Sequence, residues 1–398
     1  MKSSSLLLFP SMERETDKRS KTTIECIHDS ILIKILCYLA ADSVIRCRSV
    51  CKNWTTLIST PEFVQEYSSS GTAPFQFLLH GTVGVIQKHQ QLVLADLTET
   101  SCNPHSPRYD YPVPIKTKSL LPPTLLIKSS PHEFRICSAC NITGFIVAYA
   151  YPCNGDDLGH PYHIFNPITS QHIVVQQKNK EECWRKCALV LDHKTNQVKL
   201  LKSICLHGIA VINIQTIGTN LRRMVVSSLF NNVVNFGFPC FLNEIYHWGW
   251  SCSNNGGLVC FDPDDEAFHH IPTPQSPDIE NYHHAYLGIL DGCLSICRNT
   301  SSMTINDFEF WVMNEYGVAE SWTKILVIPK VWEQNTLSEP VRFWKYGEIV
   351  VLCDNYDVIC YNPSTGNRTF ITYYAKDDCL LSCVPIPYVP SFKRFLCI

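Results

Sequence analysis

The apolar positions follow a helical period through several consecutive elements between residues 24 and 67, and nowhere else in the chain. One set recurs at spacings of one, three and four residues, which places it on one broad face of a helix: Ile31, Leu32, Ile35, Leu36 and Leu39. Beyond Tyr67 the pattern changes to short β-branched and aromatic runs separated by Asn, Asp, Gly and Pro. The pattern therefore predicts a small helical module followed by a large β domain.

Local signals divide the module into short helices. His28 or Asp29 caps the first helix, and the polar segment 41–43 predicts a break followed by a fresh N-cap. A further apolar stripe predicts another helix that carries Val50, Trp54, Leu57 and Ile58. Pro61 fits the first turn of a helix, so we expect Thr60 to cap a last helical turn.

A module of this size buries little apolar surface. Short helices totalling about forty residues are rarely stable alone, so they usually pack against a partner or against the rest of their chain. The apolar face of the first helix is therefore a candidate docking surface for another protein. The simpler alternative for these residues is a closed intramolecular core.

The β domain follows a small-residue linker at residues 68–74 and takes up residues 75–398. Within it, an apolar strand runs repeatedly into a polar turn. These strands begin at Tyr162, Leu258, Phe308 and Val358, which lie 96, 50 and 50 residues apart, so the first gap holds two repeats. A Pro-rich interval at residues 103–123 is predicted to be a surface loop.

The length of the repeat indicates the fold class. Repeats of about 40 to 50 residues that contain four short strands are typical of β-propeller blades. The turns support this interpretation, because three of them pair an Asx turn with the fixed φ of proline: Asn166-Pro167, Asp262-Pro263 and Asn362-Pro363. We therefore predict a small all-α module followed by an all-β propeller of about six four-stranded blades.

The composition fits a globular protein and excludes several classes of function. With 398 residues, 45% of them hydrophobic, the chain can form more than one core. A net charge of -3 and a pI near 6.6 give no basis for binding nucleic acid or a membrane surface. Residues 1–23 are polar and predict a disordered tail. No apolar run is long enough for a signal peptide or a membrane helix, so we expect the cytoplasm or the nucleus.

Residues with metal-binding or catalytic potential have simpler explanations. Cys137 and Cys140 have the spacing of a zinc half-site, but no second pair lies at a suitable distance. The acids of segment 262–266 lack the Gly and the late Glu of a calcium loop, which favours a plain turn. The histidine pairs 269–270 and 283–284 lie at predicted turns. No common motif for nucleotide binding, nucleophilic catalysis or zinc catalysis occurs, so we expect no enzyme activity, no cofactor and no metal site.

The helical stretch, residues 24–67, resembles an F-box, the motif by which substrate receptors bind a Skp-type adaptor in SCF cullin ubiquitin ligases. The resemblance is carried by Ile27-His28-Asp29-Ser30-Ile31-Leu32-Ile33-Lys34-Ile35-Leu36, by Leu39, by Ser43-Val44-Ile45-Arg46-Cys47-Arg48-Ser49-Val50-Cys51-Lys52-Asn53-Trp54 and by Leu57-Ile58-Ser59. The run from Arg46 to Trp54 is especially close to the plant form.

The β domain resembles the F-box-associated domain of plant F-box proteins, a kelch-like β-propeller. Three segments carry this resemblance: Cys260-Phe261-Asp262 through Ile271-Pro272, Trp311-Val312-Met313 through Trp322-Thr323-Lys324, and Tyr361-Asn362-Pro363-Ser364-Thr365. The middle segment is the most specific, because no general structural reason requires its pattern. The two resemblances together cover nearly the whole chain from Ile24 onward, apart from residues 103–123.

The resemblances imply a non-catalytic receptor of a ubiquitin ligase. Its F-box docks on a Skp-type adaptor, and through it on a cullin, while its propeller binds the protein to be ubiquitinated. The implied adaptor-binding residues are Ile27, His28, Ile31, Leu32, Ile35, Leu36, Leu39, Val50, Trp54 and Leu57. In the propeller, Trp250 and Trp332 lie near predicted loops and are candidates for substrate contact.

Two departures from the F-box pattern leave a second function open. The family usually has Pro after its first apolar residue and after the Leu that closes its first helix, and these prolines help to set the adaptor contact. This chain has His28 and Ala40 there. The alternative is therefore a non-ligase interaction scaffold with a degenerate F-box. An enzyme on a propeller scaffold is a third possibility, because propellers can host metal and glycan chemistry.

Overall fold

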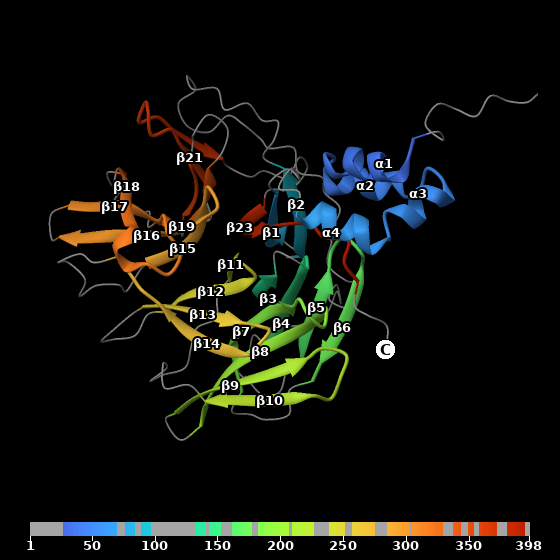
Figure 1. Ribbon diagram of the computed structural model, residues 1–398, viewed down its shortest axis with the longest axis horizontal. Coiled ribbons are helices and arrows are strands. Elements are labelled where there is room, and N and C mark those ends of the chain that lie inside the picture. The colour runs from blue at the N-terminus through green and yellow to red at the C-terminus, as the bar shows by residue number, and fades with distance from the viewer. Residues whose placement is uncertain are drawn as a thin grey trace, which may run out of the picture.

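The computed structural model describes most of the chain, in separate segments. They are residues 27–69, 76–83, 89–96, 132–140, 143–152, 161–176, 182–206, 209–226, 239–250, 257–274, 285–302, 305–328, 337–343, 349–353, 358–371 and 380–394. The predicted tail at 1–23 and the predicted loop at 103–123 lie outside them. Helices come first and strands follow, as the sequence predicts (Figure 1). None of the described helices is long and apolar enough to cross a membrane.

The N-terminal module contains α1 (Asp29–Cys37), α2 (Ala41–Cys47), α3 (Lys52–Leu57) and α4 (Pro61–Ser69). α1 begins at the predicted place, because the ring of His28 accepts a hydrogen bond from the Ser30 amide at 3.3 Å. α4 begins after Thr60, whose hydroxyl accepts a hydrogen bond from the Phe63 amide at 3.2 Å, so the predicted cap is confirmed. α4 also takes in residues 68–69, which the sequence placed in the linker.

The second helix begins earlier than the sequence predicts. Its N-cap is Ala40, with φ -59° and ψ 148°, so the cap expected within segment 41–43 is wrong. Ala40 forms no side-chain capping bond. Apolar burial stabilises the start of α2 in place of a capping bond, because Ala41 and Val44 in the first turn are both 0% exposed and pack in the core of the module. Val50, expected in the third helix, lies in the turn before α3.

The described strands form five four-stranded antiparallel sheets and one three-stranded sheet. The four-stranded sheets contain β3 (His132–Cys140), β4 (Phe145–Pro152), β5 (Tyr162–Asn166) and β6 (Gln171–Val175); β7 (Glu182–Asp192), β8 (Gln197–Leu206), β9 (Ile209–Thr216) and β10 (Arg222–Val226); β11 (Cys240–Leu242), β12 (Ile245–Trp250), β13 (Gly257–Asp262) and β14 (Ala267–Ile271); β15 (Ala285–Leu290), β16 (Cys293–Ser302), β17 (Ile305–Met313) and β18 (Trp322–Ile328); and β19 (Leu337–Phe343), β20 (Ile349–Cys353), β21 (Val358–Tyr361) and β22 (Arg368–Ile371). In each sheet, strands that follow one another in sequence are neighbours, as in propeller blades.

The three-stranded sheet joins distant parts of the chain. β1 (Gln76–Val83) pairs with β2 (His89–Asp96) on one side and with β23 (Leu380–Tyr388) on the other. Figure 1 shows β23, in red, beside β1 and close to the helices. This pairing brings residues 388–394 back to the start of the β domain.

The predicted repeat of an apolar strand and a polar turn is confirmed. Its members lie in β5, β13, β17 and β21, each of which is the third strand of its own sheet. The long first gap holds the β7–β10 sheet. There, the turn after β9 uses Gly218 at φ 81° instead of Asn-Pro or Asp-Pro, so the repeat is not visible in the sequence at this place.

The described residues form several apolar cores, and two of them include residues of the β3–β6 sheet. One lies between the β3–β6, β7–β10 and β11–β14 sheets and includes Val147, Leu189 and Phe261. The other joins the helices to the β3–β6 sheet and to the segment after β23; it contains Leu36, Phe63, Tyr67, Ile146, Phe165 and Phe392. The helical module and the β domain therefore share apolar core, and α1 to α4 are held against the sheets.

Candidate functional site: the outer face of the first helix

α1 has one face in the core and one in solvent. Leu32 and Leu36 are 4% and 1% exposed and belong to the core that the helices share with the β3–β6 sheet. On the other side Ile31 and Ile35, one helical turn apart, are 54% and 47% exposed, and Tyr38, one turn further along, is 70% exposed. We call Ile31, Ile35 and Tyr38 the outer face of α1. It presents a row of large apolar side chains to solvent, as docking surfaces do.

The residues implied as adaptor-binding fall into groups that differ in exposure. His28, Ile31, Ile35 and Val50 are exposed; Ile27, Leu39 and Trp54 are partly buried; and Leu32, Leu36 and Leu57 are buried. The simpler alternative of an intramolecular core thus holds for Leu32 and Leu36 but not for Ile31 and Ile35. The structure contains no second chain, so adaptor binding by these residues stays a prediction.

Sequence reasoning missed Tyr38. It follows Ile31 and Ile35 at helical spacing, and this signal is visible in the sequence. Its phenol ring lies at the end of α1, where Tyr38 is the C-cap. An aromatic ring with a polar tip suits a surface that is wet when free and covered when bound.

The places where an F-box usually has proline keep a backbone that proline could adopt. His28 is the N-cap of α1 with φ -63°, and Ala40 is the N-cap of α2 with φ -59°. Proline fixes φ near -65°. Both helices therefore begin at a backbone φ that proline would impose, although the chain has no proline at either position.

A hydrogen bond and a buried thiol lie beneath the outer face of α1. The hydroxyl of Tyr67 in α4 donates a hydrogen bond to the Leu39 carbonyl at 3.1 Å, which ties the end of α1 to α4. Burial, and to a smaller extent the charge of Glu66, raises the pKa of the Cys37 thiol to about 11. Cys37 is therefore a neutral core residue at physiological pH.

The predicted substrate-contact residues cannot be placed. Trp332 and the side chain of Trp250 lie outside the described residues. Two other tryptophans, from the segment 311–324 that carries the resemblance of the β domain, are described. Trp322 is 7% exposed, and its indole nitrogen donates a hydrogen bond to the Pro272 carbonyl at 2.8 Å. Trp311 is half-buried, with Lys324 Nζ 5.3 Å from the centre of its ring.

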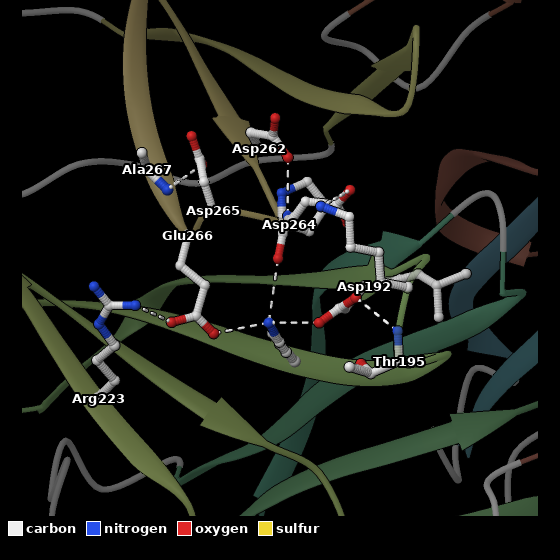
Figure 2. Close-up of polar contacts among 12 residues, drawn as sticks. Asp192, Thr195, Arg223, Asp262, Asp264, Asp265, Glu266 and Ala267 are labelled. Atoms are coloured by element: carbon white, nitrogen blue, oxygen red, sulfur yellow. Dashed lines mark hydrogen bonds and ion pairs between the residues drawn. The ribbon is translucent and has the colours of Figure 1, made fainter.

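The acidic segment 262–266 forms the turn that the sequence favoured. Asp262 accepts a hydrogen bond from the Asp264 amide at 2.8 Å, and Asp265 accepts one from the Ala267 amide at 2.8 Å. Glu266 points away to the β7–β10 sheet, where Lys199 and Arg223 donate to its carboxylate at 2.7 and 2.8 Å (Figure 2). Neighbouring cations and amides thus occupy these oxygens.

Two contacts of buried histidines could not be predicted from the sequence, because the partner residues are distant in sequence or belong to no motif. His163 Nδ1 lies 3.0 Å from His172 Nε2, and His247 Nε2 lies 2.6 Å from the Tyr316 hydroxyl. Burial lowers the pKa of His163 and of His247 to about 4 in each case. These rings are neutral at pH 7 and act as hydrogen-bonding groups of the interior.

Metal-binding side chains do not converge in the part of the chain that the structure describes. No group of three or more His, Cys, Asp or Glu residues there has the arrangement needed to hold an ion. His269 and His270 are exposed, whereas the pair 283–284 and the side chains of Cys137 and Cys140 lie outside the described residues.

Short helices with an exposed apolar face pack against the β3–β6 sheet and the end of β23, and they precede successive four-stranded antiparallel sheets of the kind that form β-propellers. Comparison with protein families agrees with this class. Residues 24–66 match the model of the F-box domain, and residues 103–384 match that of the F-box associated beta propeller domain. The second match covers well over half of the chain, so the chain belongs to the F-box associated β-propeller family.

Similar proteins come from Arabidopsis thaliana. F-box protein At3g07870 is 25% identical over 371 residues, which cover 83% of this chain and 81% of the relative. Putative F-box protein At3g23960 is 23% identical over 420 residues, which cover 97% and 94%. The similarity extends through both the helical module and the β domain.

Proposed function

We propose that the protein is the substrate-recognition subunit of an SCF ubiquitin ligase. The F-box docks on a Skp-type adaptor, and through it on a cullin, by the outer face of α1 together with Val50. The observation that carries this proposal is the exposure of Ile31, Ile35 and Tyr38 on a helix whose opposite face is buried. Burying three such side chains against a partner would contribute several kcal/mol, about 1.5 to 3 for each full side chain.

The β domain supplies the other half of the proposed receptor. We take the six described sheets as the blades of one propeller, in which β23 completes the sheet that β1 and β2 begin. Loops of this propeller bind the protein to be ubiquitinated. The cytoplasm and the nucleus, where ubiquitin ligases of this type work, are the proposed location.

The proposed receptor needs no catalytic group of its own. A tethered substrate meets the ubiquitin carrier at an effective concentration in the millimolar range for short tethers, so proximity accelerates transfer.

Co-purification tests the proposal. The tagged full chain, co-expressed with a Skp-type adaptor and a cullin, should retain both. Ile31→Asp places a charge on the outer face of α1 and should lose both. Val327→Asp on β18 is a matched control, because Val327 is a β-branched residue with 41% exposure away from the helices, and it should retain both. Absence of the adaptor from the wild-type preparation would contradict the proposal.

A second function, an interaction scaffold with a degenerate F-box, is motivated by His28 and Ala40. Replacing both by Pro separates the two proposals. A receptor with a working F-box should bind the adaptor before and after the change. A rise from no binding to strong binding would instead favour the degenerate F-box.

A further inference from the structure

Residues 388–394 leave β23 and pass between the helical module and the β3–β6 sheet. The Tyr388 hydroxyl donates a hydrogen bond to the Gly144 carbonyl at 3.0 Å. Ser391 is 0% exposed and Phe392 is 4% exposed, so the segment is built into the interior. Lys393 reaches the β7–β10 sheet, where its amine donates a hydrogen bond to the Asn196 side chain.

Asn166, the last residue of β5, holds this segment. Its side-chain nitrogen donates hydrogen bonds to the carbonyls of Ser391 at 2.9 Å and Lys393 at 3.0 Å, with the Thr143 carbonyl at 3.4 Å. Its side-chain oxygen accepts from the Ile168 amide at 2.8 Å, which is the ordinary Asx-turn contact. The side chain is 0% exposed, so both of its ends act in the interior.

The equivalent turns of other sheets show that the turn does not require the side-chain nitrogen of Asn166. At Asp262 the turn forms with a carboxylate, which accepts from the Asp264 amide at 2.8 Å. At Asn362 the side-chain oxygen accepts from the Ser364 amide at 3.0 Å, and the residue is only partly buried. An oxygen is therefore sufficient for the turn. The amide nitrogen of Asn166 serves residues 391–393.

Phe392 connects the same segment to the helices. Its ring lies edge-on to Tyr67 of α4, with centroids 5.1 Å apart, and its centroid lies 5.5 Å from that of Phe63. Gly144 leaves room for this passage, since a Cβ there would lie 2.9 Å from the Ser391 backbone nitrogen. Close packing therefore fixes Phe392 against α4 and Ser391 against Gly144.

We propose that residues 388–394 are a strut that holds the F-box in one orientation on the propeller, and that Asn166 is the positioning residue that locks it. The amide of Asn166 fixes the backbone on either side of Phe392, and Phe392 fixes α4 through Phe63 and Tyr67. The orientation of the helices is then determined by residues far from the segment that links α4 to β1.

The consequence for ligase activity rests on the proposed function. A substrate held on the propeller and an adaptor held on α1 are kept at a fixed separation only if the helices cannot swing on the sheets. A rigid receptor presents the target to the ubiquitin carrier at a higher effective concentration than a loosely jointed one. Asn166 would therefore influence ubiquitin transfer without contacting either partner.

Hydrogen exchange of the full chain tests the strut without any partner. Asn166→Asp keeps the oxygen of the turn, removes the donors and places a carboxylate against two carbonyls. We expect amides of α1 and α4 to exchange faster by about tenfold or more, as for loss of a buried hydrogen bond, with the β15–β18 sheet unchanged. Asn362→Asp makes the same chemical change at the equivalent turn and should leave the helices at the wild-type rate.

Phe392→Ala is the second variant, because it leaves Asn166 and its turn intact, and it should produce the same local increase. Equal helix exchange in Asn166→Asp and Asn362→Asp would overturn the proposal. An increase spread evenly over the β15–β18 sheet would also overturn it, since Asn166 would then support the whole fold. Exchange is measured without adaptor, so failure of the strut and failure of the proposed adaptor binding are separate results.

Discussion

The amine of Lys199 lies 2.7 Å from the carboxylate of Glu266 and joins the β7–β10 sheet to the turn between β13 and β14. Asp192 also lies 2.9 Å from this amine, and the Lys199 side chain is only 7% exposed. Burial acts to lower the pKa of Lys199, but the hydrogen bonds with Glu266 and Asp192 outweigh it and the pKa is raised. A charged lysine thus holds two carboxylates of different sheets.

Removing this amine should destabilise the β domain strongly. We expect Lys199→Met to lower the free energy of unfolding by about 3 kcal/mol, because the buried Asp192 loses its counter-charge and Glu266 keeps only Arg223. Urea unfolding followed by tryptophan fluorescence measures this. Lys194→Met is the control, since Lys194 pairs with Asp264 at 3.0 Å but is 71% exposed, and its midpoint should hardly change. Equal effects of the two variants would contradict the role of burial.

Acid should destabilise the fold through His247. Burial lowers its pKa from 6.5 to about 4, while the hydrogen bonds that the ring donates to the backbone of Cys240 and Ile245 act in the opposite direction. The unfolded chain then binds the proton more readily than the folded one, so stability falls as pH falls from about 6.5 to about 4. The expected loss is about 3 kcal/mol, at 1.36 kcal/mol per pKa unit.

Unfolding measured at several pH values should show this slope in the wild type. His247→Gln removes the titrating ring and should flatten it, although His163 contributes a similar part in the same pH range. A wild-type slope that survives His247→Gln undiminished would show that this ring is not the source.

Substitution of Gly144 should destabilise the fold for two reasons, its positive φ and the close approach of Ser391. Gly144 and Gly366 both have positive φ, 65° and 69°, which L side chains rarely adopt. A Cβ at Gly144 would also lie 2.9 Å from Ser391 atoms, whereas one at Gly366 meets nothing within 4 Å. We expect Gly366→Ala to cost about 1 kcal/mol and Gly144→Ala about 2 kcal/mol more. Thermal unfolding of the two variants compares them, and equal losses would contradict the close contact.

Proline should be tolerated at both N-cap positions. His28 and Ala40 have φ -63° and -59°, so Pro fits either backbone, and it reduces the entropy of the unfolded chain. Pro at position 28 also removes the side-chain cap on the Ser30 amide, so we expect His28→Pro with Ala40→Pro to leave the free energy of unfolding within about 1 kcal/mol of the wild type. Circular dichroism during heating measures this. A clear loss of helix would mean that the present backbone excludes proline.

The sequence predicted the architecture because each element carries a local signal. The helical spacing of Ile31, Leu32, Ile35 and Leu36, the Pro61 helix start and the recurring turns were sufficient for a helical module and four-stranded sheets. The same signals could not show which apolar residues of α1 are buried and which are exposed. Ile31 and Leu32 are neighbours of similar hydrophobicity, and only tertiary packing decides that one is 54% exposed and the other 4%.

Contacts between distant residues were beyond the reach of local patterns. Asn166 carries a turn motif that fully explains its presence, so nothing in the sequence indicates a second role at Ser391. Tyr316 lies within a recognised run, yet its partner His247 belongs to another sheet. The second cap differed from expectation for a related reason, because burial of Ala41 and Val44 outweighed local capping preference.

Calorimetric titration of the purified full chain with a purified Skp-type adaptor tests the central claim most directly. The wild type should bind with one-to-one stoichiometry, and Ile35→Asp should weaken binding by about tenfold or more, since it introduces a charge into an apolar contact. Ile325→Asp, at a residue of β18 with 41% exposure, should bind like the wild type. Absence of binding by the wild type, or equal affinity of Ile35→Asp and the wild type, would contradict the claim that the outer face of α1 is the docking surface.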